Sequence, residues 1–322
     1  MRIRPLQTAD LPEVANLIGQ AYSDTLLRLH GRDALAAYQP RTPAMLATLL
    51  ELGPEFCFVG EAAGRLTGAI FGRAWGSLGW FSSLAILPEE QGHGQGRALA
   101  TASIDALRAA GCHAIGLETW PAAATYTAMY VRLGFRPVGL STQLYAPVAI
   151  DWPAPRDCRL VTTDALPAGL RTARFAAAAA IADRHFTGLS LEIEITHAEA
   201  TPAADVLCLV RDDAIAGFAI VDTRPDYDLE GPHADLRAAL LNPATTDASD
   251  FLALVGAAAG LAAAAGRQFI DLDAGTAHLQ TYRFLLDAGF RAGGQLLRFI
   301  SADADYPGDT AGPLFSFGRW ST

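Results

Sequence analysis

The chain repeats itself at a constant interval of 155 residues. Adding 155 to a position in the first half returns the same residue many times, in the same order. The matches include glycines and prolines, which mark turns and the ends of helices. The matched pairs are Arg4 and Arg159, Thr8 and Thr163, Leu11 and Leu166, Pro12 and Pro167, Pro88 and Pro243, Leu99 and Leu254, Gly111 and Gly266, Ile115 and Ile270, Leu117 and Leu272, and Gly134-Phe135-Arg136 and Gly289-Phe290-Arg291. A chain of this kind encodes one succession of elements twice, and we expect two similar domains.

Prolines place the boundary between the copies. Pro147, Pro153 and Pro155 interrupt regular structure just before the second copy begins. We therefore expect a first domain over residues 1–150 and a second over 151–322. The stretches Arg65–Gly72 and Ala214–Val221 match at an offset of 149, so six residues enter a loop after this point in the second copy.

Hydrophobic patterning predicts a mixed α/β fold for each copy. Thr8 or Asp10 is the expected N-cap of the first helix, with Pro12 in its first turn. The other elements expected in the first copy are strands at 3–6, 55–61, 66–75, 80–87 and 114–119, helices at 34–52, 94–110 and 124–133, and a last strand after Gly134.

The charge distribution limits the ligands. The chain has 322 residues, 51% of them hydrophobic, and a net charge of −10; every basic residue is an arginine. Residues 1–150 hold 11 Arg and 11 Asp plus Glu, whereas residues 151–322 hold 13 and 23. An acidic half repels nucleic acid and anionic membrane surfaces. A polyanionic ligand is therefore expected only in the first half.

Targeting, membrane, metal and disulfide signals are all weak. Met1–Asp10 reaches charged residues before any apolar run, and the Ala- and Gly-rich stretch Phe251–Gly266 is short for a bilayer span. The four cysteines have no paired spacing, and His185 and His197 lack partners at metal-ligand spacing. We expect a cytoplasmic protein without a metal, a membrane partner or a nucleic-acid partner.

A glycine-rich loop follows the predicted strand at 80–87. The stretch Leu84–Arg97 reads LAILPEEQGHGQGR and leads directly into a helix. Unpaired N–H groups at a helix start bind phosphate, and the absence of Cβ atoms at Gly92, Gly94 and Gly96 lets a phosphate approach the backbone. An ordinary glycine-rich connection is the alternative. A P-loop is excluded because no G-K-[ST] follows, and the dinucleotide spacing is absent.

Three segments in series resemble one family. Gln91–Gly96 is similar to the Q/R-x-x-G-x-G/A signature of the GCN5-related N-acetyltransferase (GNAT) family. Leu117–Thr119 resembles its LET segment, and Tyr130–Phe135 resembles its Y-x-x-x-G-F segment. The resemblance covers nearly all of residues 1–145. It implies a tandem member of the family, with acetyl-CoA as the co-substrate. Each α/β domain should then have a mixed, mostly antiparallel central sheet flanked by helices.

The resemblance also implies roles for particular residues. The strand at 80–87 should diverge from the strand at 114–119, and main-chain groups there should pair with the pantetheine arm. Tyr130 should be the general acid that protonates the leaving thiolate; the alternative is a packed aromatic side chain. The residues expected to bind the cofactor are Leu84, Ala85, Ile86, Gln91, Gly92, His93, Gly94, Gln95, Gly96 and Arg97. His93 is the member of this set expected to face solvent.

Two departures from the family pattern concern the cofactor and the base. Ala123 stands where family members often have an asparagine, so one cofactor contact should be missing. The strand at 80–87 offers no carboxylate. The general base is then Glu118 or a chain of water molecules, and Glu118 is equally suited to be a structural acceptor.

The second copy lacks the residues that carry the chemistry. At the offset of 155, Gln91, Gly94, Gly96 and Arg97 correspond to Thr246, Ser249, Phe251 and Leu252, and Tyr130 corresponds to Leu285. Side chains in the loop block a pyrophosphate, and leucine cannot donate a proton. We expect a degenerate second domain that packs on the first.

The leading hypothesis is an N-acetyltransferase acting on an amine by direct attack on the thioester. A cationic acceptor, a small molecule or a peptide, would suit the acidic half. The alternatives are a non-catalytic acyl-CoA sensor or scaffold, and transfer of a different acyl group or to a different acceptor. The chain is expected to be a monomer, as an internal pseudo-dimer, or a homodimer.

Overall fold

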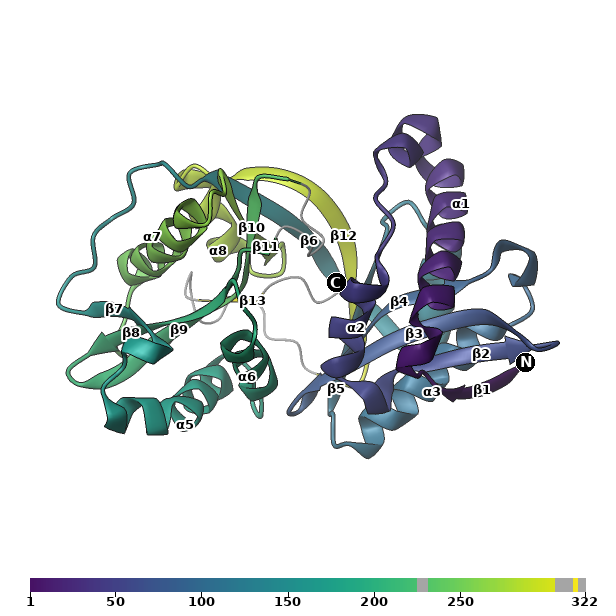
Figure 1. The fold of residues 1–322 in the computed structure, drawn as a ribbon, viewed down its shortest axis with the longest axis horizontal. Coiled ribbons are helices and arrows are strands. Elements are labelled where there is room, and N and C mark those ends of the chain that lie inside the picture. Colours follow the sequence, from purple (N-terminus) through teal and green to yellow (C-terminus); the bar gives the residue numbers. More distant parts are fainter. Residues whose placement is uncertain (225–230, 305–314, 318–322) are drawn as a thin grey trace. The chain divides into compact units, whose positions relative to one another are not determined.

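The computed structural model describes residues 1–224, 231–304 and 315–317 (Figure 1). They form two compact units. The first unit consists of residues 1–137 and 297–304, and the second of 138–224, 231–296 and 315–317. Residues 305–314 and 318–322 of the predicted second domain lie outside the described part of the chain.

The first unit is built on one mixed sheet. Its elements in chain order are β1 (Arg2–Pro5), α1 (Leu11–Ala37), α2 (Pro43–Glu51), β2 (Phe58–Ala62), β3 (Arg65–Trp75), β4 (Leu78–Ile86), α3 (Gln95–Ala109), β5 (Ala114–Thr119), α4 (Ala124–Arg132) and the end of β12 (Arg291–Ser301). The strand order is β1-β2-β3-β4-β5-β12. Only β4 and β5 run parallel; the other neighbours are antiparallel. The fold class predicted from the sequence is confirmed.

Successive side chains of a strand point to opposite faces of the sheet, and this creates two cores in the first unit. Phe71 of β3 packs with the buried side chains of α1 and α2, whereas Ile70 packs with those of α3 and α4. The helices α1 and α3 therefore cover opposite faces of the sheet (Figure 1).

The second helix predicted from the sequence, residues 34–52, is wrong. Residues 34–37 are the end of α1, and α2 begins at Pro43 after an interruption. Pro40 and Pro43 explain the difference, because proline cannot donate the hydrogen bond of a helix interior and disfavours a helical residue before it. Thr42 caps α2 by accepting a hydrogen bond from the Met45 amide.

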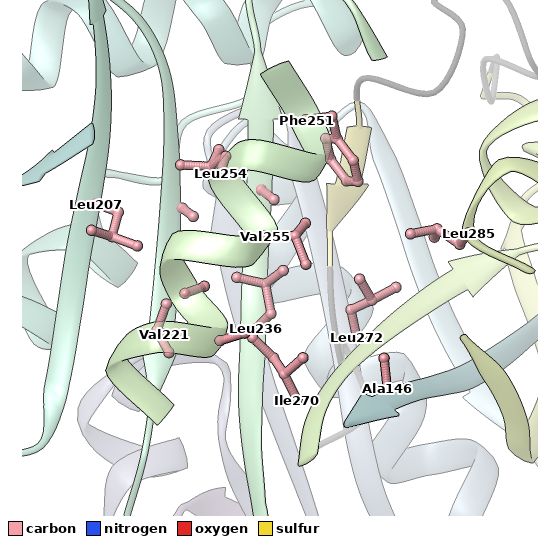
Figure 2. Close-up of a cluster of buried hydrophobic side chains, with 14 of the residues drawn as sticks. Ala146, Leu207, Val221, Leu236, Phe251, Leu254, Val255, Ile270, Leu272 and Leu285 are labelled. Carbon is pink, nitrogen blue, oxygen red and sulfur yellow. The ribbon is translucent and has the colours of Figure 1, made fainter. Parts of the chain in front are cut away.

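The second unit has the same plan. Its elements are β6 (Phe135–Pro147), β7 (Arg159–Thr162), α5 (Ala168–His185), α6 (Glu192–Ala200), β8 (Ala204–Arg211), β9 (Ala214–Asp222), β10 (His233–Leu241), α7 (Ala248–Ala264), β11 (Phe269–Gly275), α8 (Leu279–Asp287) and β13 (Phe315–Phe317). The strand order is β6-β11-β10-β9-β8-β7, and β13 pairs with β10. Figure 2 shows the core of this unit, where Phe251, Leu254 and Val255 of α7 share one cluster with strand residues such as Leu236 and Ile270.

The duplication read from the sequence is visible residue by residue. The helix α4 spans 124–132 and α8 spans 279–287, an offset of 155 at both ends. The parallel pairing of Leu78–Trp80 with β5 recurs, at the same offset, in the pairing of His233–Asp235 with β11. The strands β3 and β9 begin at an offset of 149, as predicted.

The units differ from the predicted domain ranges because the copies exchange their last strands. The strand β6 closes the first copy in sequence, yet it pairs with β11 of the second unit. The strand β12 closes the second copy, yet its residues 297–300 pair with β5 of the first unit. Residues 138–150 therefore do not belong to the first unit, and residues 297–304 do. Equivalent strands of the two copies therefore complete each other's sheets.

Candidate active site

The strands β4 and β5 diverge in the first unit. Pairing joins Leu78–Trp80 to Ala114–Gly116, and within the described residues it goes no further. Beyond this point the backbone of β5 is open: the Glu118 side chain is 0% exposed, yet the residue as a whole is half-exposed. The exposed surface of Glu118 is therefore main chain. A bulge at Ser83, where φ is +51°, adds to the divergence by bending β4.

Hydrogen-bond alternation decides which groups of β4 face the gap. The Leu87 amide donates to the Thr67 carbonyl at 3.0 Å, so the backbone groups of Ala85 also face β3 and those of Ile86 face away from it. The Gln91 side chain donates to the Ile86 carbonyl at 3.0 Å. Among the residues predicted to bind the cofactor, Ala85 therefore uses its backbone groups in the sheet with β3. The Ile86 amide faces the gap, and Leu84 is half-buried.

The predicted glycine loop presents a helix start to solvent. Gly92 and Gly94 have φ angles of +83° and +79°, which favour glycine, and nothing lies within 4 Å of a Cβ atom built on either. The helix α3 follows at once, and its first internal bond runs from the Ala98 amide to the Gly94 carbonyl. Within the described part of the chain, no side chain caps this helix. The Gln91 amide donates to the Pro88 carbonyl at 3.3 Å, and the amides from Gly92 to Arg97 are available to an anion.

Side chains hold the loop in place without covering it. Gln95 accepts a hydrogen bond from Thr67 at 2.9 Å and donates to Glu90 at 2.9 Å. Arg65 forms ion pairs with Glu89 and Glu90, both at 3.0 Å, which offsets the negative charge beside the helix start. His93 is exposed, as the sequence predicts, and so is Arg97.

Tyr130 of α4 is buried near the gap. It packs against Phe81 and Phe299, with ring centroids 6.1 and 5.8 Å away. Its hydroxyl has no hydrogen-bond partner among the described residues. Burial raises the pKa of Tyr130 above its usual range, and the nearby hydroxyls of Tyr22 and Tyr126 raise it further. The phenol is therefore protonated at every physiological pH.

Aromatic side chains gather beside Tyr130, and the sequence reading missed them. Tyr22 of α1 meets Trp120, which follows β5, edge to face at 5.1 Å, and Tyr38 at 6.4 Å. The Tyr126 hydroxyl hydrogen-bonds to Thr25 at 2.8 Å. The spacing of Tyr126 and Tyr130 on one helix face was the available signal. The contribution of α1 had no local signal because it is a long-range contact.

Glu118 forms a buried ion pair. Arg298 of β12 lies opposite it in the sheet, and its Nε and Nη2 atoms are each 2.8 Å from Oε1. The side chains of Arg298 and Glu118 are 5% and 0% exposed. The guanidinium also lies over the ring of Trp80, 5.6 Å from its centroid. A carboxylate held in this way suits a structural role better than proton transfer, and no sequence pattern predicted its partner.

The second unit replaces the corresponding features with apolar packing. Phe251 and Leu285, at the positions of Gly96 and Tyr130, are both 0% exposed and belong to the core of that unit. Among the described residues, no group of three or more His, Cys, Asp or Glu side chains is suited to a metal. No helix in that part of the chain is long and apolar enough to cross a membrane.

Comparisons with known proteins agree with this geometry. The sequence profile described as "Acetyltransferase (GNAT) family" matches residues 23–135. No curated protein sequence matches the chain. A putative acetyltransferase from Pyrococcus horikoshii is similar in structure, with a TM-score of 0.65 and 12% identity over 99% of this chain and 95% of its own.

Two further solved structures resemble the chain over nearly its full length. A GCN5-related N-acetyltransferase from Sphaerobacter thermophilus has a TM-score of 0.64 and 15% identity, over 97% of this chain and 98% of its own. A tandem GNAT protein from the clavulanic acid biosynthesis pathway has a TM-score of 0.55 and 17% identity, over 95% and 99%. Residues 23–135 therefore match the acetyltransferase (GNAT) family, and the chain as a whole has the fold of tandem GNAT proteins.

Proposed function

We propose that the first unit binds acetyl-CoA and transfers its acetyl group to an amine. The observation that carries this proposal is the uncapped, glycine-lined start of α3 beside the gap between β4 and β5. A long ligand with a pyrophosphate at one end and amide groups along its arm needs these two features side by side. The second unit, without the glycines and the tyrosine, is then a non-catalytic partner.

In this proposal the loop Gln91–Arg97 holds the pyrophosphate through the amides that follow Gln91. Gly92 and Gly94 leave room for it, and Arg97 adds a positive charge. The pantetheine arm follows β4, where the Ile86 amide faces the gap and Leu84 is accessible. The family generally uses acetyl-CoA. That this chain does so is our proposal.

Tyr130 is the proposed general acid. The amine nitrogen attacks the thioester carbonyl carbon, the C–S bond breaks, and the sulfur takes the phenolic proton. The raised pKa of Tyr130 keeps this proton in place at neutral pH, while the absence of a competing hydrogen bond leaves the hydroxyl available. A phenol of raised pKa is a weaker acid, so its proton moves only as negative charge collects on the sulfur.

The amine loses its own proton to solvent in our account. Glu118 was one sequence candidate for the base, but its side chain is inaccessible and paired with Arg298. The exposed backbone of β5 lies directly beside the gap and allows water to reach it. A water chain is therefore the better proton acceptor.

The aromatic side chains beside Tyr130 favour an acceptor with an apolar or cationic body. Tyr22, Trp120 and Tyr126 are each half-exposed, so part of every ring can meet a ligand. Aromatic faces attract ammonium groups as well as apolar groups. An amine carrying such a body fits these residues better than a polyanionic one does. Four unpaired cysteines fit a reaction in the reducing cytoplasm.

Replacement of Tyr130 by phenylalanine tests the proposal. An amine library is screened for release of free CoA thiol, and the variant is compared with Tyr126→Phe, which removes a hydroxyl from the same helix. We expect Tyr130→Phe to lower kcat by about 10²–10⁴ while the Kd for acetyl-CoA stays within about twofold. Tyr126→Phe should lose less than about tenfold.

Two results would point elsewhere. Unchanged turnover in Tyr130→Phe would remove this residue from the chemistry. Tight acetyl-CoA binding with no turnover of any amine would favour the acyl-CoA sensor, or a different acyl group or acceptor. The buried state of Glu118 gives the sensor hypothesis its physical basis, because the carboxylate that the sequence offers as the base is inaccessible.

A further inference from the structure

The second unit keeps the divergence of strands that marks the proposed cofactor site in the first. Within the part of the chain that the structure describes, β10 pairs with β11 only at His233–Asp235, and β4 pairs with β5 only at the equivalent residues Leu78–Trp80. A bulge interrupts both β4 and β10 beyond this point. Both units therefore open a gap at the same place in the fold.

In the second unit the chain itself lies along this gap. The strand β13 pairs antiparallel with β10, with Ser316 opposite Ala239. The Asn242 amide donates to the Ala216 carbonyl of β9, so by alternation the backbone groups of Ala239 and Leu241 face away from β9. The paired residue Ala239 is equivalent to Leu84. The backbone edge that the pantetheine arm would use in the first unit is thus taken by a strand.

The helix start beside the gap is occupied as well. The Asp247 carboxylate caps α7, accepting hydrogen bonds from the amides of Ser249 at 2.8 Å and Asp250 at 3.1 Å. The Asp250 carboxylate in turn accepts from the Asp247 amide at 3.0 Å and pairs with Arg211 at 2.8 Å. These are amides of the first turn, the groups that bind phosphate at an open helix start. The equivalent helix α3 has no such cap among the described residues.

We propose that the second unit carries a built-in substitute for an acyl-CoA. The strand Phe315–Phe317 takes the place of the pantetheine arm, and the Asp247 carboxylate takes the place of the pyrophosphate. The gap between β10 and β11 is then a strand-binding site whose ligand is an extended segment of this same chain. The comparison with the cofactor rests on the proposed function of the first unit, whereas the strand site rests on the pairing alone.

This arrangement explains how the second unit keeps two diverging strands beside a helix start without binding a cofactor there. An open edge between two diverging strands leaves backbone N–H and C=O groups unpaired and invites association with other chains. Pairing with β13 satisfies the open edge of β10. The capped helix satisfies the amides that the phosphate would have held. In the second unit, backbone groups that a bound ligand would otherwise satisfy are therefore satisfied by the chain itself.

Proline at position 316 tests the strand. Ser316→Pro removes the amide donor opposite Ala239, and Ser316→Thr is the matched control because threonine suits a strand. Hydrogen exchange is followed in the full chain without acetyl-CoA. We expect the Ala239 amide to exchange at least about tenfold faster in Ser316→Pro and within about threefold of the wild type in Ser316→Thr. Equal exchange in all three chains would overturn the proposal.

A second variant tests the carboxylate. Asp247→Ala should speed exchange of the Ser249 and Asp250 amides by about tenfold and leave the Ala239 amide protected. Unchanged exchange at Ser249 and Asp250 would overturn the role of Asp247. Acetyl-CoA titration of the same variants separates this inference from the proposed function: binding to the first unit should be unaffected, and its absence in the wild type would refute only the proposed function.

Discussion

Removal of Arg298 tests how the exchanged strand supports the candidate site. Arg298→Met keeps the length of the side chain and deletes the charge that balances Glu118. Both side chains are at least 95% buried, and Glu118 Oε2 has no hydrogen-bond partner among the described residues. The variant therefore leaves a buried carboxylate without a counter-charge, which costs about 3–5 kcal/mol. The stacking of the guanidinium on Trp80 is lost as well.

The free energy of unfolding is measured by urea titration, with exchange of the β5 amides to identify the first unit. With a slope of roughly 2 kcal/mol per molar urea, the midpoint of that unit should fall by about 1.5–2.5 M. Asp303→Asn is the control, because the Asp303 side chain is 67% exposed in its pair with Arg108 and should contribute less than about 1 kcal/mol.

The double variant Arg298→Met with Glu118→Gln separates charge from packing. Glutamine removes the unbalanced charge, so the double variant should recover at least about half of the loss. A loss below about 1 kcal/mol in Arg298→Met, or no recovery in the double variant, would refute the reasoning. In that case Glu118 would be free for a role in proton transfer.

Three further predictions concern local features. Burial raises the pKa of the Cys57 and Cys208 thiols to about 12 and that of the Cys112 thiol to about 11. At pH 8 only Cys158, which is half-buried, should therefore react with Ellman's reagent before unfolding, and two or more fast thiols would contradict this burial. The hydrogen bond from Arg4 holds the pKa of Asp10 below its usual value. The contribution of the Asp10 carboxylate to the free energy of unfolding is therefore present above its pKa in the unfolded chain, and it is lost as the pH falls through its pKa in the folded protein. Asp10→Asn should cost about 1–2 kcal/mol in urea at pH 7 and progressively less as the pH falls below the unfolded pKa of Asp10, and a cost that does not change with pH would contradict this linkage. A Cβ atom at Gly116 would lie 1.9 Å from the Trp80 ring, so Gly116→Ala should destabilise the first unit by at least about 2 kcal/mol in the same titration, and a neutral result would place the ring elsewhere.

Features set by local chemistry could be read from the sequence. The fold class, the duplication and the glycine loop depend on short-range patterns, and the fold and family predicted from them are confirmed. The helix predicted over residues 34–52 failed because hydrophobic spacing continued across Pro40 and Pro43. The roles assigned to Tyr130 and the loop residues stay predictions.

Features set by long-range pairing could not be read from the sequence. The strands β6 and β12 have the same place in their copies, so no pattern states which sheet each completes. The partner of Glu118 followed from this exchange and was missed with it. The strand β13 has three residues, too few for a periodicity, and its position depends on an edge formed by residues far earlier in the chain.

The central claim is that one acyl-CoA binds each chain, at the start of α3. Calorimetric titration with acetyl-CoA tests it most directly, using Gly94→Trp and, as a matched control, Gly111→Trp. Both glycines have positive φ, +79° and +93°, and open space around them, so the two variants carry similar backbone strain. We predict one site in the wild type and in Gly111→Trp, and no measurable binding in Gly94→Trp. Two sites per chain, or undiminished binding in Gly94→Trp, would contradict the account.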